Sequence, residues 1–419
     1  MSINRRRIAI TGLGVIAPNA IGKDRFETAL FSGQSGIRGI SIPADSGPPC
    51  YVEARITDFS PSEYWGPRIR KAGKSLSRVS QFALACSQMA LEDAGIELSQ
   101  LDPRRTGLCY GTTVGKQDFS DDAVRFYTSG APSLEPSAWA EFPPHAPASH
   151  IATVLGFSGP IATISAGCCT GLMVTDWAAQ RIATGRLDTA LVGSCDSLLS
   201  PLILAGFGAG GLLTKRSDPA TASRPYDLHR DGLVPGEAAG AIVLESLQSA
   251  LERNAPIYAE YLGFDSAVDL SGPRERTRNG QGLCRAIRGA LDNAGLAPNQ
   301  IDCINSHGLS HPVLDLIETQ GFKEALGRAA YSVAITSIKP MTGACFAADG
   351  ILQTISSCLI LDKGEIPPIL NLKTPDPDCD LDYVTKPRVA RVNVVLTNTR
   401  AIGGANAVVL LGRVDRGTS

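Results

Sequence analysis

The sequence lacks the features that would assign it to a membrane or a nucleic acid. No apolar run reaches the roughly 18 residues that a membrane span needs. No apolar stretch with a cleavage site opens the chain, so we expect no signal peptide. A formal net charge of −2 over 419 residues gives no basic surface for nucleic acid. We therefore expect neither a membrane nor a nucleic-acid partner.

Signatures of metal, disulfide and nucleotide sites are also missing. The eleven cysteines are odd in number and scattered, without a CxxC pair or Cys/His ligand spacing, so we predict no metal. Several lie in apolar runs, as buried free thiols do, which predicts a reduced, cytoplasmic protein. Gly12-Leu13-Gly14 lacks the third glycine of a dinucleotide-binding turn, so no nucleotide cofactor is predicted.

What the sequence does contain is an alternation of strand and helix patterns, in the same order on both sides of about residue 250. Expected strands are 8–14, 106–112, 161–165, 187–194, 239–245, 258–263, 302–306, 333–337, 392–397 and 407–411. Expected helices are 75–94, 170–184, 280–294, 312–326 and 344–361. Proline-rich 131–147 is expected to be a loop or insertion. The alternation predicts an α/β layered fold with mainly parallel sheets and an internal duplication.

The segment 164–171, "ISAGCCTG", places two cysteines where a strand pattern turns into a helix pattern. A thiol at the first turn of a helix lies where N–H groups and the macrodipole favour thiolate, and those N–H groups can also bind an oxyanion. Two interpretations of Cys168 stay open, nucleophile or small core residue. Cys169 is expected to fill the core.

A nucleophilic cysteine needs a partner that manages protons, and the chain has only five histidines. His307 ends an apolar strand pattern, and the strand ends of an α/β sheet are where ligands bind, so it is the best candidate. A structural role for His307 stays open. His229 lies in the polar turn "RPYDLHRDG" and is expected to be structural.

Motifs spread over nearly the whole chain resemble those of the β-ketoacyl-ACP synthase family. They are "SAGCCTG", "RPYDLHRDGLVPGEAAGAIVLE", "SHGLSHPVLDLIE", "SIKPMTGACFAADG" and "TNTRAIGGANAVVLLG". The resemblance implies a thiolase-like, five-layered αβαβα fold of two similar halves, here 1–254 with the nucleophile and 255–419 with His307 and Lys339. It also implies acyl transfer from an acyl carrier protein, then malonyl decarboxylation and Claisen condensation. The resemblance implies no cofactor, because the substrates are attached to the phosphopantetheine of the acyl carrier protein.

The resemblance also assigns roles to residues. The family's nucleophile matches Cys168, followed by Thr170 in the same motif, and its first catalytic histidine and its lysine match His307 and Lys339. Its acidic residue matches Glu318, which we expect to form an ion pair with Lys339. The oxyanion N–H groups match those of Cys168 and Ile402, with Gly403 completing the gate turn.

The chain departs from the family pattern at three places. Ala344 stands where the family has its second catalytic histidine, so that imidazole is lost. Leu309, Ser310 and His311 replace the segment with the pantetheine-binding threonines, and Ser310 or His311 is the remaining candidate for that contact. An aromatic gate is replaced by Arg400 and Ile402.

Several functions remain compatible with these departures. The chain could be a condensing enzyme, a chain-length-factor-like subunit of a ketosynthase heterodimer, or an acyltransferase that does not decarboxylate. A scaffold without acyl chemistry stays open. A homodimer and a heterodimer are both compatible. Cys345 could replace the missing imidazole, but we expect it to be a packing residue that is turned away on a helix.

Overall fold

The computed structural model describes residues 6–40, 50–64, 76–116, 119–130, 138–269 and 280–414. The strands are β1 (Ile8–Ala17), β2 (Ala20–Ile21), β3 (Arg38–Gly39), β4 (Val52–Glu53), β5 (Thr106–Gly111), β6 (Ile161–Ala162), β7 (Thr189–Ser197), β8 (Glu237–Ser246), β9 (Ala259–Val268), β10 (Cys303–Asn305), β11 (Ala334–Thr336), β12 (Glu365–Ile366), β13 (Arg388–Val389), β14 (Val394–Arg400) and β15 (Ala405–Gly412). The helices are α1 (Lys23–Phe31), α2 (Pro61–Tyr64), α4 (Arg78–Asp93), α5 (Phe119–Ser129), α6 (Ala138–Glu141), α7 (Ala146–Leu155), α8 (Thr170–Ala183), α9 (Pro201–Ala209), α10 (Pro219–Ala222), α11 (Leu247–Glu252), α12 (Gln281–Ala294), α13 (Leu314–Leu326), α14 (Lys339–Thr342) and α15 (Ala347–Lys363). None of these helices combines the length and apolar character that a membrane span requires.

The main sheet shows the duplication that the sequence predicts. In space, the strands of one half follow the order β6-β5-β7-β8-β1 and those of the other half the order β11-β10-β14-β15-β9. When the five strands of each half are ranked by their order along the chain, the two spatial orders are the same. The directions also match, because β5 and β10 are parallel to both neighbours while β8 and β15 are antiparallel to theirs. The halves join where β1 pairs with β9.

The prediction of mainly parallel sheets is wrong, because half of the pairings within each half-sheet are antiparallel. The expected closing hairpin explains one of them. β14 and β15 are joined by the short Gly403-Gly404 turn, and so short a connection allows only antiparallel pairing.

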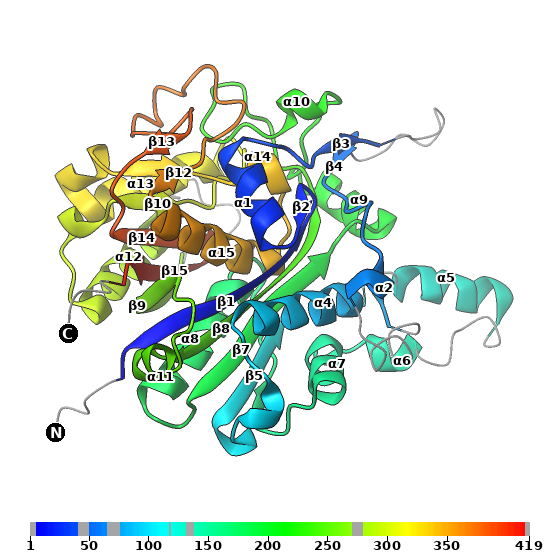
Figure 1. Ribbon diagram of the computed structural model, residues 1–419. Coiled ribbons are helices and arrows are strands. Elements are labelled where there is room, and N and C mark those ends of the chain that lie inside the picture. The colour runs from blue at the N-terminus through cyan, green and yellow to red at the C-terminus, as the bar shows by residue number, and fades with distance from the viewer. Residues whose placement is uncertain are drawn as a thin grey trace.

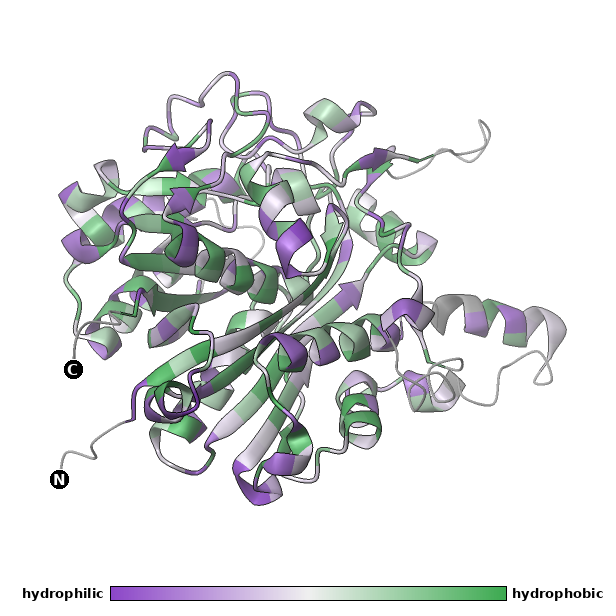
Figure 2. Ribbon diagram, viewed as in Figure 1, coloured by the Kyte–Doolittle hydropathy of each residue, from purple (hydrophilic) through white to green (hydrophobic). Residues whose placement is uncertain are grey.

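Helices form three layers around the two half-sheets (Figure 1). α4 packs on β1, β7 and β8, and α12 packs on β9 and β15 and against α13, so these helices form the outer layers. α8 and α15 pack on each other and on strands of both halves, which places them in the middle. The expected five-layered αβαβα fold is therefore confirmed. Figure 2 shows the apolar character of the central strands, and α15 is buried all round over 347–361, as a helix in a middle layer must be.

The two middle helices cross at their first turns, with glycine on both sides. A Cβ on Gly171 of α8 would lie 2.2 Å from the Ile351 nitrogen, and one on Gly350 of α15 would lie 2.8 Å from the Leu172 nitrogen. Only residues without a side chain permit this approach. The crossing brings the residues just before α8 next to the first turn of α15.

Some expected boundaries differ from the observed ones. The strand expected at 161–165 is only Ile161–Ala162, and the helix expected at 344–361 begins at Ala347. Residues 131–137 of the expected loop 131–147 lie outside the described residues. In the described remainder, α6 occupies Ala138–Glu141 and α7 begins at Ala146, so these two pieces are helical rather than loop.

Candidate active site

Cys168 lies in a tight turn directly before α8. Gly167 has φ 56°, a conformation that favours glycine, and the Cys169 and Thr170 N–H groups donate to the Ala166 and Gly167 carbonyls. The Ala166 N–H donates to Thr170 Oγ1 at 2.9 Å, so the Thr170 hydroxyl holds the turn closed. Cys169 is fully buried, with its sulfur 3.5 Å from the Ala405 carbonyl, as expected for a packing residue.

Three side chains from distant parts of the chain meet at the Cys168 sulfur. Cys168 Sγ, a ring nitrogen of His307 and a carboxylate oxygen of Asp349 all lie within 4.8 Å of one another, and all three residues are buried. His307 follows β10 in the second half, and Asp349 lies in the first turn of α15. The structure thus brings together Cys168 and His307, as predicted from the sequence, and adds a carboxylate.

Lys339 belongs to the same cluster, but its partner differs from the predicted one. Its Nζ lies 3.3 Å from Asp349 Oδ1 and 3.4 Å from Gln353 Oε1, and its side chain is almost wholly buried. The predicted ion pair with Glu318 is therefore wrong. The reason is topological: α15 lies in the middle layer beside Lys339, whereas α13, which carries Glu318, packs against the outer helix α12.

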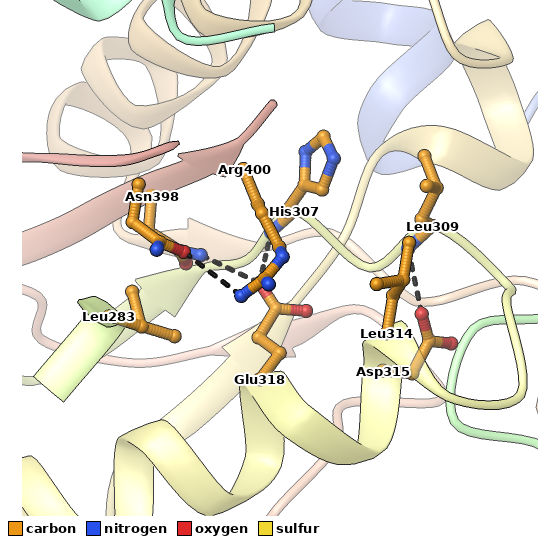
Figure 3. Close-up of a pocket in the computed structure, with 9 residues that line it drawn as sticks. Leu283, His307, Leu309, Leu314, Asp315, Glu318, Asn398 and Arg400 are labelled. Atoms are coloured by element: carbon orange, nitrogen blue, oxygen red, sulfur yellow. Dashed lines mark hydrogen bonds between the residues drawn. The ribbon is translucent and has the colours of Figure 1, made fainter. Parts of the chain in front are cut away.

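Glu318 instead holds the backbone that carries His307. Its carboxylate accepts hydrogen bonds from the His307 N–H at 2.8 Å, the Gly308 N–H at 3.0 Å, the Tyr226 hydroxyl at 2.7 Å and the Asn398 amide at 2.7 Å. Figure 3 shows the His307 ring pointing away from Glu318. Within the described part of the chain neither ring nitrogen has a hydrogen-bond partner, so Glu318 holds the His307 backbone while both ring nitrogens stay unpaired.

Burial dominates the electrostatics of the cluster. It raises the pKa of the Cys168 thiol well above its ordinary value, assisted by the Asp349 charge and opposed by Lys339. Burial, Lys339 and Arg400 lower the pKa of His307 well below its ordinary value. The resting groups are therefore a thiol and a neutral imidazole, rather than the thiolate that a helix N-terminus alone would favour.

Burial also raises the pKa of the Asp349 carboxyl, although Lys339 and the Cys345 N–H work against that shift. Zinc can bind thiol, imidazole and carboxylate groups such as those of Cys168, His307 and Asp349, but the neighbouring positive charge disfavours a metal ion among them. The Lys339 ammonium, 3.3 Å from Asp349 Oδ1, opposes a second cation there.

A cavity of about 650 Å³ reaches Cys168. Its lining includes Leu309, Ala344, Phe346, Ile402 and Gly403. Residue 344 therefore contributes only a methyl group to the lining of this cavity. Ile402 is 66% exposed, so the gate turn that contains Gly403 lies at the surface end of the cavity.

His311 and Ser310, the two candidates for the pantetheine contact, lie in different environments in the structure. His311 lines the cavity, and its Nδ1 accepts the Val313 N–H at 3.2 Å, next to the start of α13. Ser310 is fully buried and its hydroxyl accepts the Arg224 N–H at 2.9 Å, so His311 is the better placed of the two candidates for the pantetheine contact. The left-handed φ of 64° at Ser310 turns its side chain into this backbone bond.

Asp349 and Phe346 are the site residues that the sequence reasoning missed. Phe346 has φ 51°, stacks on Phe207 with ring centroids 4.9 Å apart and lines the cavity together with Cys168. A single acidic residue inside the apolar run of "ACFAADGILQ" was the available signal for Asp349, since an unpaired buried carboxylate is costly. Cys345 precedes α15, contrary to expectation, but it is buried with its sulfur 3.2 Å from the Thr342 carbonyl, which confirms packing.

Comparisons with known proteins cover nearly the whole chain. Residues 5–250 match the family model described as the β-ketoacyl synthase N-terminal domain, and residues 258–373 match the C-terminal domain. A 3-oxoacyl-[acyl-carrier-protein] synthase 2 of Coxiella burnetii is 34% identical, covering 98% of this chain and 100% of the relative. The tetracenomycin polyketide synthase ketoacyl synthase alpha subunit of Streptomyces glaucescens is 35% identical, covering 97% of each chain.

Solved structures agree with these relatives. The ishigamide ketosynthase/chain length factor superposes with a TM-score of 0.89 at 30% identity, covering 98% of this chain and 100% of that one. A type II polyketide synthase acyl-carrier protein in complex with its ketosynthase gives a chain that superposes with a TM-score of 0.88 at 29% identity, again covering 98% and 100%.

Proposed function

Since this chain belongs to the β-ketoacyl synthase family of condensing acyltransferases, we propose that it loads an acyl group from an acyl carrier protein onto Cys168 and extends it by Claisen condensation. The observation that carries this proposal is the buried Cys168 sulfur at a cavity of about 650 Å³, with His307 and Asp349 within 4.8 Å. The nucleophile comes from the proposed N-terminal half, 1–254, and His307 and Lys339 from the C-terminal half, 255–419.

Each cluster residue has a distinct task in this proposal. Cys168 forms the acyl thioester, and the N–H groups of Cys168 and Ile402 stabilise the oxyanion of the tetrahedral adduct. His307, held neutral, donates a hydrogen bond to a substrate carbonyl. Glu318 orients His307 and Lys339 anchors Asp349, so both act as positioning residues, and Thr170 holds the nucleophile turn closed.

Ala344 makes the enzyme atypical, because the second imidazole of the family is absent. Loss of one donor to a developing oxyanion costs on the order of 10²–10³ in rate. Asp349 places a carboxylate oxygen within 4.8 Å of Cys168 Sγ, and a negative charge there opposes the enolate that forms when malonate loses CO₂. This observation favours a second candidate function, an acyltransferase that passes the Cys168 acyl group to a nucleophile other than malonyl.

A chain-length-factor-like role in a heterodimer is the remaining alternative. The structural similarity to the ishigamide ketosynthase/chain length factor supports this alternative. The retained Cys168 counts against it. The proposed partners are an acyl carrier protein, whose phosphopantetheine passes His311 in the cavity, and a second ketosynthase-like subunit or copy of this chain. No other cofactor and no metal is proposed. All eleven cysteines are free, which supports a reducing, cytoplasmic location.

Intact mass after incubation with hexanoyl carrier protein tests the proposal. We expect a single hexanoyl adduct in the wild type and none in Cys168→Ala, while Cys169→Ala, the adjacent packing residue, keeps the adduct. Release of CO₂ from malonyl carrier protein by the loaded protein identifies the condensing enzyme, and loading without CO₂ release identifies the transferase. Absence of any adduct at Cys168 would overturn the acyl-enzyme proposal.

A further inference from the structure

The Asp349 carboxylate is buried and close to the Cys168 sulfur, and only one of its two oxygens accepts a hydrogen bond from the described residues. Oδ1 accepts the Cys345 N–H at 2.7 Å and lies 3.3 Å from Lys339 Nζ. Oδ2 is buried, and within the described residues it has no hydrogen-bond partner. A buried carboxylate oxygen without a partner is costly, and such groups concentrate where chemistry is done. One oxygen is thus fixed while the other stays available.

We propose that Asp349 is a catalytic residue, the base that takes the Cys168 thiol proton during acyl loading. This inference rests on the proposed acyl-enzyme function. A carboxylate oxygen of Asp349 lies within 4.8 Å of Cys168 Sγ, and the close crossing of α8 and α15 fixes the two backbones relative to each other. The hydrogen-bonded turn before α8 positions Cys168, and the hydrogen bond from the Cys345 N–H positions the Asp349 carboxylate.

The loading step balances without any further reagent. The S–H proton of Cys168 passes to Asp349 while Sγ bonds to the thioester carbonyl carbon. The adduct collapses as its bond to the pantetheine sulfur breaks, and that sulfur receives the proton from the Asp349 carboxyl. One thioester and one thiol are exchanged for another thioester and thiol, so no electrons are gained or lost.

The surrounding charges make His307 and Asp349 differ in their ability to accept a proton. Lys339 and Arg400 disfavour an imidazolium, which makes His307 a poor proton acceptor, whereas burial shifts the pKa of Asp349 upward and makes it a better one than an ordinary carboxylate. The cluster also faces Asp196, whose charge raises the pKa of both the Cys168 and the Cys345 thiols, and the Glu237 charge raises the pKa of Cys345 as well. Asp196 is itself held by hydrogen bonds from Thr112, Thr113 and the Ala347 N–H.

The test is the pH dependence of Cys168 acylation by the thioester hexanoyl-N-acetylcysteamine, followed by intact mass on the full chain. In the wild type we expect the rate to level off above the pKa of the carboxyl. In Asp349→Asn we expect a loss of about 10²-fold near neutral pH, and a log rate that climbs with a slope of about 1 as the thiolate fraction grows. Asp362→Asn, an exposed carboxylate on the same helix, is the matched control and keeps the wild-type profile.

Each outcome decides something. A wild-type plateau that persists unchanged in Asp349→Asn, or that disappears in His307→Ala instead, overturns the role of Asp349 but leaves Cys168 loading intact. If the Asp349→Asn variant does not fold, the pH profile of the wild type is sufficient for the test. A wild-type log rate that rises with pH at a slope of about 1 through alkaline pH, without a plateau, also overturns the inference. Failure of the wild type to load at Cys168 overturns the proposed function as well, so the two failures are distinguishable.

Discussion

Gly171→Ala tests whether the crossing of α8 and α15 builds the site. An alanine Cβ would lie 2.2 Å from the Ile351 nitrogen and 2.7 Å from the Gly350 carbonyl carbon, more than 1 Å short of ordinary contact with the first of these atoms. Alanine in a helix gains about 1 kcal/mol over glycine. Overpacking costs about 1–3 kcal/mol, and here the upper end applies because backbone cannot rotate away. We expect a net loss of about 2 kcal/mol.

Urea denaturation of the full chain measures this balance, and hexanoyl loading of Cys168 reports the geometry. Separation of the helices moves Asp349 from the sulfur, so loading is expected to slow about tenfold or more. Gly206→Ala is the matched control: it lies in α9, and a Cβ there meets nothing within 4 Å, so we expect a gain of up to about 1 kcal/mol and unchanged loading. A Gly171→Ala protein as stable and as active as the wild type would refute the reasoning.

Three further expectations concern histidine and carboxylate groups. His307→Ala is expected to slow acyl transfer from the carrier by about 10²-fold, whereas His229→Ala, outside the cluster, leaves it unchanged; equal activity of both would remove His307 from the site. Ala344→His, whose new side chain faces the cavity, is expected to raise CO₂ release from malonyl carrier protein, and unchanged release in a folded variant would show that another group is missing. Burial alone raises the pKa of Glu141, but the neighbouring His150 side chain and hydrogen bonds from Ser77 and Ser80 lower it to about 2. This stabilisation is complete above the unfolded value near 4.5 and is lost as pH falls towards about 2, so Glu141→Gln is expected to lower the urea midpoint near neutral pH and to leave it unchanged near pH 2.

Most of the fold was predictable because its signals are local. Hydrophobic periodicity located the long strands and helices to within a few residues, as for α8, expected at 170–184 and observed at Thr170–Ala183. Strand direction was not predictable in the same way. β7 and β8 are antiparallel although a long excursion separates them, and neither strand's own pattern specifies its neighbour.

The site was predictable where a motif and its chemistry are contiguous. Cys168 and the turn held by Thr170 follow from one short segment, and His307 follows from a strand end. Glu318 was found but given the wrong partner, because a carboxylate in a motif carries no information about which cation the fold places beside it. Asp349 was missed because its role depends on a contact between α15 and the residues before α8.

The sequence by itself determined the alternation of strands and helices, the thiol ahead of a helix and the alanine at position 344, since each is encoded by residue types at fixed short spacing. Only the tertiary structure decided which buried charges meet. Asp349 faces Cys168 because two helices from opposite halves cross at Gly171 and Gly350, closer than any side chain would allow. Pairing between such distant segments depends on shape complementarity in three dimensions, which no periodicity along the chain records.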